Sequence, residues 1–474
     1  MRRSAARVAG AVVAGAALTL SGCLMGPNYQ RPKLAVPPSY RGAPAASAAS
    51  ASTPAALAGL GAEHWFQLFP DPVLQRLERT AMQNNYDVRI AATRVLEAQQ
   101  EAGITRADEF PLADVNASGV SEHNPKIAPP IQGYSAGYGA LNLSLVWNLD
   151  FWGRYRRATE AAREQWLATQ WGQRAVVSSV VAQVAAAYFG LRQMDDALAI
   201  ARRTLAARQQ SLHLTQVLAA NGSASDLELS QSQELVAQAA ETVPELERES
   251  AQQENLLSTL LGSNPGPIPR GEPLMAQPNP PSVPPGLPST LLERRPDIRQ
   301  AEDELMAANA EVGVARASLF PNIRLTGDGG AESNALNRLF TGVGKQWDLA
   351  VGLTQPVFAA GALRATVRLS EAQKQQLLLS YEQTVQQAFR QVSDALVALQ
   401  KDHQFRQQQQ LLVQAAQRAS TLSNTLYQNG GGSFLQVLVA EDEAFSAELN
   451  LSQAELNERL ALVALYNALG GGWQ

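Results

Sequence analysis

The sequence is poor in the residue types from which many active centres and covalent cross-links are built. Only one cysteine occurs among 474 residues, aromatic residues make up 6%, and there are four histidines. A single cysteine excludes an intrachain disulfide and any metal centre that needs several cysteines. The formal net charge of −5 provides no basic surface for nucleic acid, so we expect no nucleic acid partner.

Recognisable catalytic motifs are also missing. The sequence contains no phosphate-binding loop, no nucleophile elbow and no HExxH pattern, and its glycine runs 430–432 and 470–472 are not followed by lysine. The histidines are far apart and do not recur in the internal repeat of the chain, which favours ordinary surface positions: they are His64, His123, His213 and His403. We expect neither an enzyme nor a resident cofactor or metal.

The N-terminus has the three regions of a secretory signal. Three arginines precede an apolar run that ends at Leu20, and this run is shorter than the ~20 apolar residues of a spanning helix. The small residues Ser21 and Gly22 before Cys23 are typical of a bacterial lipoprotein. We therefore expect residues 1–22 to be a lipoprotein signal peptide and Cys23 to carry a covalent lipid. Leu24, where known inner-membrane lipoproteins have Asp, indicates the outer membrane. The alternative is an ordinary exported protein with an incidental cysteine.

The rest of the chain contains one long pattern twice. The segment 103–111 matches 313–321 at an offset of 210 residues, and later positions match at an offset of 208. Two copies of one supersecondary unit are expected to pack side by side. The predicted organisation is a lipidated N-terminal tether over 23–64, a first repeat over 65–263, a Pro-rich linker over 264–289 and a second repeat over 290–474. The pairs at offset 208 are Gly153 with Gly361, Val184 with Val392, Asn221–Gly222 with Asn429–Gly430, and Leu261–Gly262 with Leu469–Gly470.

Each copy is predicted to begin with a helix, from Pro72 to about Ala107 in the first, followed by a β-hairpin. Apolar residues alternate with polar ones over 141–149 and again over 349–354, which is the period of a strand with two different faces. A weaker strand precedes each of these segments. The sequence therefore predicts four strands in all.

Very long helices follow each hairpin. Residues 155–219 and 362–428 contain no proline, and some 65 helical residues extend for roughly 100 Å. Each stretch ends in a glycine-containing turn, and Ser225 with Glu228 and Ser433 with Gln436 form capping boxes for a returning helix. A long helical hairpin is expected to close each copy.

The strand length points to a membrane. A two-faced strand of about ten residues matches the ~9–11 needed to cross a bilayer, and lipid admits strands only in closed barrels. Four strands cannot close a barrel, because the smallest familiar barrels have about eight. Several chains are therefore expected to share one barrel. The alternative is a soluble α+β protein in which the hairpins form an ordinary sheet.

Three motifs stand out, namely Cys23–Pro32, Leu291–Arg299 continued through Ala301–Glu302, and Ala468–Trp473. With these motifs the chain resembles the outer-membrane factors of tripartite RND-type efflux systems, specifically the TolC-like lipoproteins of the NodT branch. The resemblance implies an α+β membrane protein, a homotrimer whose twelve-stranded β-barrel is continued by an α-helical periplasmic tunnel. It also implies a periplasmic adaptor protein and an inner-membrane RND-type pump as partners, besides outer membrane lipid.

The same resemblance implies a periplasmic gate. Carried over by position, the gate consists of Tyr427, Leu435, Val439 and Asp442, of which the last three share one helix face. Many relatives have Asp where this chain has Val439. The alternative is that Leu435 and Val439 are coiled-coil seam residues. The hairpin tips are predicted to dock the adaptor: Asn221, Gly222, Ser223, Asn429 and Gly430.

We therefore expect a passive exit duct that conducts drugs or other toxic compounds from the adaptor and pump to the cell exterior. Two alternatives use the same features. One is an exit channel for protein secretion, and the other is a periplasmic coiled-coil scaffold without a pore.

Overall fold

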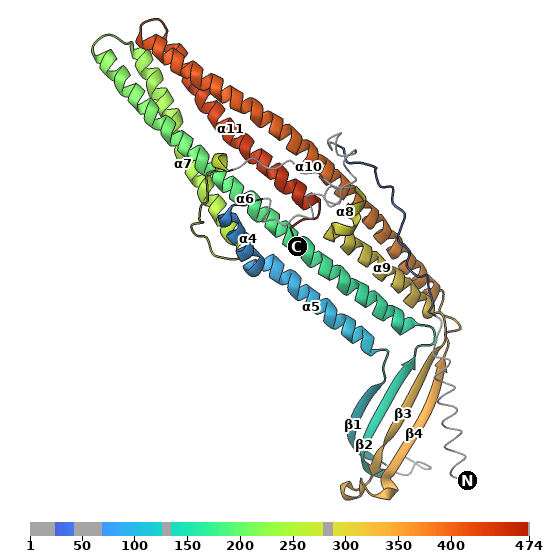
Figure 1. Ribbon diagram of the computed structural model, residues 1–474. Coiled ribbons are helices and arrows are strands. Elements are labelled where there is room, and N and C mark those ends of the chain that lie inside the picture. The colour runs from blue at the N-terminus through green and yellow to red at the C-terminus, as the bar shows by residue number, and fades with distance from the viewer. Residues whose placement is uncertain (1–23, 42–68, 126–133, 278–287, 473–474) are drawn as a thin grey trace. The chain divides into compact units, whose positions relative to one another are not determined.

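The computed structural model describes residues 24–41, 69–125, 134–277 and 288–472 (Figure 1). Cys23 and Trp473 lie outside the described residues. The chain forms two compact units: unit 1 contains residues 1–33, 94–169 and 300–381, and unit 2 contains residues 34–93, 170–299 and 382–474. Each unit draws on both sequence copies, so the repeat boundaries at 65–263 and 290–474 do not coincide with the units.

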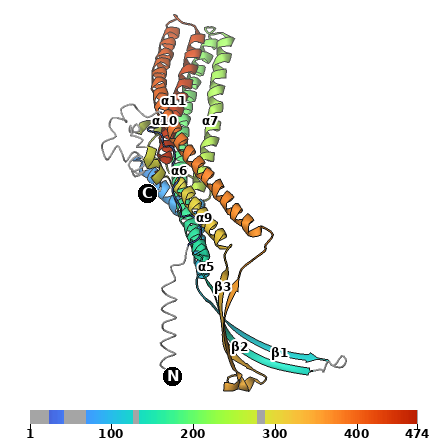
Figure 2. The same ribbon diagram turned by 90° about the vertical axis from the view of Figure 1, so that its right-hand side faces the viewer.

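Unit 1 contains a four-stranded antiparallel sheet in the order β1-β2-β3-β4, and Figure 2 shows that it is strongly twisted. Both predicted hairpins are confirmed. Two short 3-10 helices, η4 (Leu336–Arg338) and η5 (Gly342–Gly344), connect β3 to β4. The two copies meet at the centre of the sheet, where β2 pairs with β3. The strands are β1 (Leu112–Asn124), β2 (Tyr134–Leu149), β3 (Asn322–Ser333) and β4 (Lys345–Thr354).

The helix before each β-hairpin is broken in two, which corrects the prediction of one helix from Pro72 to Ala107. In the first copy α4 (Pro72–Asn84) and α5 (Tyr86–Ala107) are separated by Asn85. The Asn85 side chain accepts hydrogen bonds from the backbone N–H of Asp87 and Val88, at 2.8 and 3.2 Å, and so caps the start of α5.

The second copy has the same break 210 residues later, between α8 (Pro288–Arg294) and α9 (Pro296–Ala317). Asn85 Nδ2 donates to the carbonyl of Leu260 at 2.8 Å, and Arg295 Nη1 donates to the carbonyl of Ala468 at 2.9 Å. Two different side chains thus hold the C-terminal end of the returning helix in the two copies. Pro288 lies in α8, so the Pro-rich linker ends earlier than residue 289.

The long helical hairpins are confirmed. They consist of α6 (Arg154–Ala220) with α7 (Asp226–Leu260), and α10 (Ala362–Gln428) with α11 (Phe434–Ala468). Both capping boxes are formed, at Ser225 and at Ser433. One window of α6 is long and apolar enough to cross a bilayer by length and composition alone, and 56% of it is buried, as in the core helix of a globular protein. The largest fully buried side chains of unit 2 include Tyr188, Phe189, Leu191, Leu257, Leu274 and Leu462.

The described part of the predicted tether, residues 24–41, is not a free linker. It has no regular secondary structure, but it packs closely on unit 1 at its start: Arg157 donates to the Met25 carbonyl at 3.1 Å, and Arg31 pairs with Glu302 at 2.8 Å. A Cβ on Gly26 would lie 2.5 Å from the Cα of Gly313, so only glycine allows this approach. Polar side chains of the body thus satisfy the backbone of the segment and hold it in place.

The described part of the linker, residues 264–277, also packs on the helices. Arg270 pairs with Asp195 of α6 at 3.2 Å, and the backbone N–H of Gly271 donates to the Tyr188 hydroxyl. Only a single 3-10 turn, η3 (Leu274–Ala276), interrupts its irregular path. Leu274 is fully buried, so this segment belongs to the core of unit 2.

Candidate functional site at the ends of the helical hairpins

The two hairpin tips have the same backbone geometry. The chain leaves α6 through Gly222 (φ +71°) and α10 through Gly430 (φ +74°), a left-handed conformation that favours glycine. Backbone N–H groups two residues past Asn221 and Asn429 return to the carbonyls of Leu218 and Leu426, at 2.8 and 2.9 Å. Each asparagine side chain also donates to its own helix at 2.7 Å, to Val217 and Thr425 respectively. These bonds satisfy carbonyls at the ends of the helices.

The predicted gate residues fall into two groups. Leu435 and Val439 lie on an exposed face of α11, with 58% and 50% of each residue exposed in the single chain. Tyr427 instead packs its ring against Phe434, with centroids 5.2 Å apart. The structure therefore does not bring Tyr427 together with the other two. One buried apolar cluster between the two helices of the second hairpin consists of other residues, namely Val413, Ala416, Ala447 and Leu451.

Tyr427 borders a small cavity of about 60 Å³ between the two hairpins. Burial raises the pKa of Tyr427, and the nearby carboxylate of Glu228 raises it further. Its phenol is therefore neutral across the physiological range, and its ring packs against Phe434. The cavity is otherwise lined by residues of all four long helices, among them Leu214, Leu218, Leu235, Phe434, Val437 and Leu438.

Asp442 is the fourth predicted gate residue, and it links the hairpins. Its carboxylate accepts a hydrogen bond from Nη2 of Arg208 in α6 at 3.1 Å. The Arg208 side chain is only 2% exposed; it also donates to the carbonyl of Leu235 at 3.0 Å and lies over the Phe445 ring. Sequence reasoning missed Arg208 because Ala416 takes its place in the second copy, so it is invisible in the repeat.

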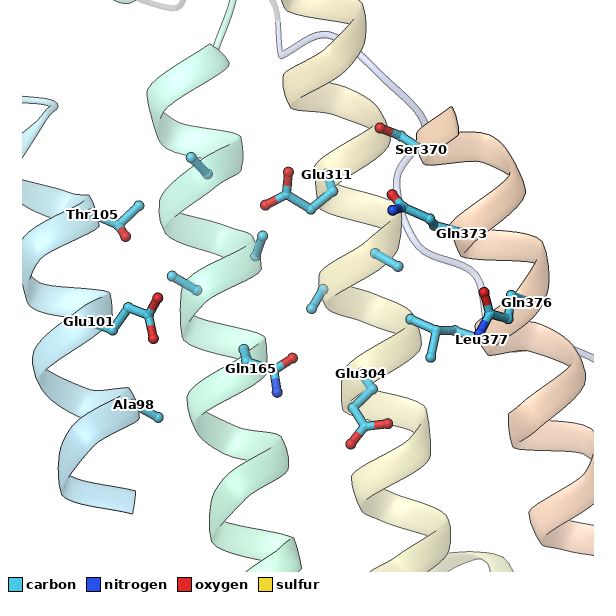
Figure 3. A pocket seen from close by; sticks show the side chains of 15 residues that line it. Ala98, Glu101, Thr105, Gln165, Glu304, Glu311, Ser370, Gln373, Gln376 and Leu377 are labelled. Atoms are coloured by element: carbon cyan, nitrogen blue, oxygen red, sulfur yellow. The ribbon is translucent and has the colours of Figure 1, made fainter. Parts of the chain in front are cut away.

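A larger cavity of about 530 Å³ lies in unit 1 between α5, α6, α9 and α10. Figure 3 shows Glu101, Glu304 and Glu311 with several glutamines around it, while the alanines of α6 and α9 leave it wide. Burial raises the pKa of Glu311. The described residues hold no group of three His, Cys, Asp or Glu side chains placed to bind a metal ion. This cavity offers a polar, acidic wall and no catalytic arrangement.

The model of the family described as outer membrane efflux protein matches residues 77–263 and 287–471, which is most of the chain. The chain belongs to this family. The starts of the two matched segments are 210 residues apart and their ends are 208 apart. The match therefore follows the register of the internal repeat.

Individual members of the outer membrane efflux protein family are similar over nearly their whole length. The cation efflux system protein CusC of Escherichia coli is 35% identical over 460 residues, covering 97% of both chains. The solvent efflux pump outer membrane protein SrpC of Pseudomonas putida is 36% identical over 460 residues, again covering 97% of both. The crystal structure of the open MtrE outer membrane channel of Neisseria gonorrhoeae has a TM-score of 0.83 at 29% identity, covering 95% of this chain and 99% of that one.

These matches confirm the main sequence predictions. The protein is an outer membrane efflux protein with the fold of the trimeric outer-membrane efflux channels, and it serves as the exit duct of a tripartite efflux system. The soluble α+β alternative was wrong. The family is one of transport channels rather than enzymes. The NodT branch, the lipid on Cys23, the gate residues and the docking tips stay predictions.

Proposed function

We propose that the chain forms a homotrimeric, lipid-anchored duct that passively conducts drugs or other toxic compounds. An RND-type pump in the inner membrane supplies the energy, and a periplasmic adaptor joins it to the hairpin tips. The duct needs no catalytic residue and no cofactor besides a covalent lipid on Cys23. Relatives named for the efflux of cations and solvents support a substrate class of small toxic compounds.

The observation that carries this proposal is the exposed apolar face of α11 directly after the tip. Leu435 and Val439 lie one helical turn apart and about half of each is exposed in the single chain. In a trimer closed around an axis, three copies of this face form an apolar seal that excludes water and ions. The pair between Arg208 and Asp442 holds that face against the first hairpin.

Introducing negative charges at Leu435 or Val439 tests the apolar seal. In Leu435→Asp or Val439→Asp, three carboxylates face one another, and each close pair costs about 4 kcal/mol at 4 Å with an effective dielectric near 20. We expect normal trimer yield, higher single-channel conductance in planar bilayers, and entry of vancomycin into cells. Poor assembly without a gain in conductance would instead identify these residues as seam residues.

The repeat provides a matched control. Leu227 is the counterpart of Leu435 in the first hairpin, 208 residues earlier, and it is similarly exposed at 65%. Leu227→Asp should leave conductance unchanged, because the first hairpin does not form the seal. An equal rise in conductance in both variants would move the gate away from the second hairpin.

A further inference from the structure

The internal repeat extends to the register of the strands. In the first hairpin Leu112 is opposite Val146, and in the second Asn322 is opposite Thr354. The first members of these pairs are 210 residues apart and the second members 208 apart, which are the two offsets of the sequence repeat. The strands of the two copies therefore have equivalent backbones, so the backbone pairing made by one strand edge predicts the pairing of its counterpart.

Within the chain, the copies contact each other through β2 and β3. Leu145 is opposite Gly327 and Leu141 is opposite Ala331. At the helix end of this interface Trp152 stacks on Phe320, with centroids 4.9 Å apart and an interplanar angle of 25°. The Trp152 indole also donates to the carbonyl of Pro321 at 2.9 Å. The interface between β2 and β3 thus has a defined register and a stacked aromatic pair at one end.

The outer edges of the sheet are the counterparts of these two strands. Strand β1 corresponds to β3 and strand β4 corresponds to β2, and among the described strands each of them pairs on one side only. All ten residues of β4 are exposed, including Trp347 at 83%. At the helix end, Phe110 is 57% exposed, and Val357 and Phe358 are 95% and 88% exposed. Unpaired edges with exposed apolar side chains need a partner strand.

We propose that β4 of one chain pairs with β1 of the next in the register transferred from β2 and β3. Applying the two offsets places Leu353 opposite the neighbour's copy of Ala117, and Leu349 opposite its copy of Ser121. This inference rests on the proposed homotrimer, and it adds which residues meet. The neighbour's copy of Phe110, the counterpart of Phe320, then lies against Val357 and Phe358, because Ala360 replaces Trp152 in the second copy.

The transferred register keeps the two faces of the sheet intact. It continues the apolar row of β2 through Leu349, Val351 and Leu353 into Val115 and Ala117. A slip of one residue would move Asn116 and Ser118 into that row, because successive side chains point to opposite faces. On the other face it sets Asp348 opposite Glu122, as Asp328 is already opposite Asp348 within the chain. Such acidic neighbours are tolerated on a face that water reaches.

Paired cysteines test the register in the full-length trimer. Leu353→Cys with Ala117→Cys, and Gly352→Cys with Ser118→Cys, sample both kinds of antiparallel pair, one of which brings side chains close enough for a disulfide. Mild oxidation should give covalent dimers and trimers on a denaturing gel for at least one pair. Its yield should be at least about fivefold above that of Leu353→Cys with Gly119→Cys or Gly352→Cys with Val120→Cys, the pairs displaced by two residues.

A higher yield for the displaced pairs would overturn the proposed register while leaving the homotrimer intact. The molecular mass of the unmodified protein in detergent tests, independently of the register, whether the chain forms a homotrimer. A monomer would refute the proposed function itself. The mass of each double variant before oxidation shows that it still assembles. Unmodified protein, whose only cysteine is Cys23, should give no covalent oligomer.

Discussion

The two returning helices, α7 and α11, are equal in length and different in environment. Each has 35 residues and begins with a capping box, yet six residues are buried in α7 and eighteen in α11. In the described chain α11 is packed along much of its length, whereas α7 keeps one long side open. Helices with the same length and the same capping can therefore have different surroundings. The open side of α7 is where a neighbouring chain of the trimer has room to pack.

The ion pairs of the two helical hairpins differ in burial in the same way. In each helical hairpin an arginine of the first helix pairs with a glutamate of the returning helix. The pairs are Arg202 with Glu247 and Arg406 with Glu455, and the two glutamates occupy equivalent positions in the repeat. The first pair is exposed, at 60% and 49% of the side chains, and the second is buried, at 4% and 8%. Arg406 also contacts Glu458, whose carboxylate accepts a hydrogen bond from His403 Nδ1 at 2.7 Å. The second hairpin thus encloses a buried ion cluster that the first lacks.

Breaking this cluster should have the largest effect on stability. Arg406→Gln removes the guanidinium that pairs with two buried carboxylates, Glu455 and Glu458, and leaves them with His403 and Arg459 nearby, which costs about 3–5 kcal/mol. Arg202→Gln removes only an exposed pair, worth about 0–1 kcal/mol. The midpoint of urea unfolding at fixed trimer concentration measures both. Equal shifts would mean that the buried cluster contributes no more than a surface pair.

Weakening the contact between Arg208 and Asp442, which links the two hairpins, should have an intermediate effect on stability. Asp442→Asn weakens the contact with Arg208 at a half-exposed position, so we expect a loss of about 1 kcal/mol. Single-channel conductance should rise, but by less than in Leu435→Asp, because the apolar seal remains. Unchanged conductance at normal trimer yield would show that the Arg208 contact does not hold the second hairpin closed.

Substitutions at the hairpin tips should impair efflux with little change in the stability of the protein. No atom lies within 4 Å of a Cβ built on Gly222 or Gly430, so only the positive φ is strained, at roughly 1 kcal/mol. Gly222→Trp and Gly430→Trp should leave trimer yield intact and abolish drug efflux in cells. Gly222→Ala and Gly430→Ala carry the same strain without the bulk and should retain efflux. Normal drug resistance in both Trp variants would place adaptor docking elsewhere.

The lipid should matter least for assembly. Cys23→Ser should abolish acylation, yet trimers should stay in the membrane because the strands hold them there. Metabolic labelling with palmitate and membrane fractionation measure the two effects. Release of folded protein into the periplasm would contradict membrane-spanning strands.

The local features were predictable from sequence, and the long-range contacts were not. Strand period, proline-free stretches and capping boxes identified both hairpins because each signal lies within a few residues. The break at Asn85 and Arg295 was missed because it depends on carbonyls of Leu260 and Ala468, more than 170 residues away. Arg208 was missed because Ala416 takes its place in the second copy and its partner Asp442 is 234 residues away.

The three motifs behind the family resemblance have a shared physical role at their described positions. Gly26 approaches Gly313, and Arg295 binds the Ala468 carbonyl and pairs with Asp297. Gly470, at φ +81°, packs on Arg294 and Arg295. All three are sites where the N-terminal segment or the C-terminus closes on the second copy. The motifs therefore mark places where distant parts of the chain pack together, and they do not include the predicted gate residues or the tips.

The hydrogen bond from the Met25 backbone N–H to the Trp152 carbonyl, at 3.2 Å, has a consequence for the depth at which the protein sits. Two residues span at most about 7 Å, so the predicted lipid on Cys23 would be attached within that reach of the point where β2 leads into α6. Acyl chains can enter the bilayer only from its surface. If Cys23 carries the predicted lipid, the N-terminal segment would therefore fix this junction at the periplasmic surface of the outer membrane.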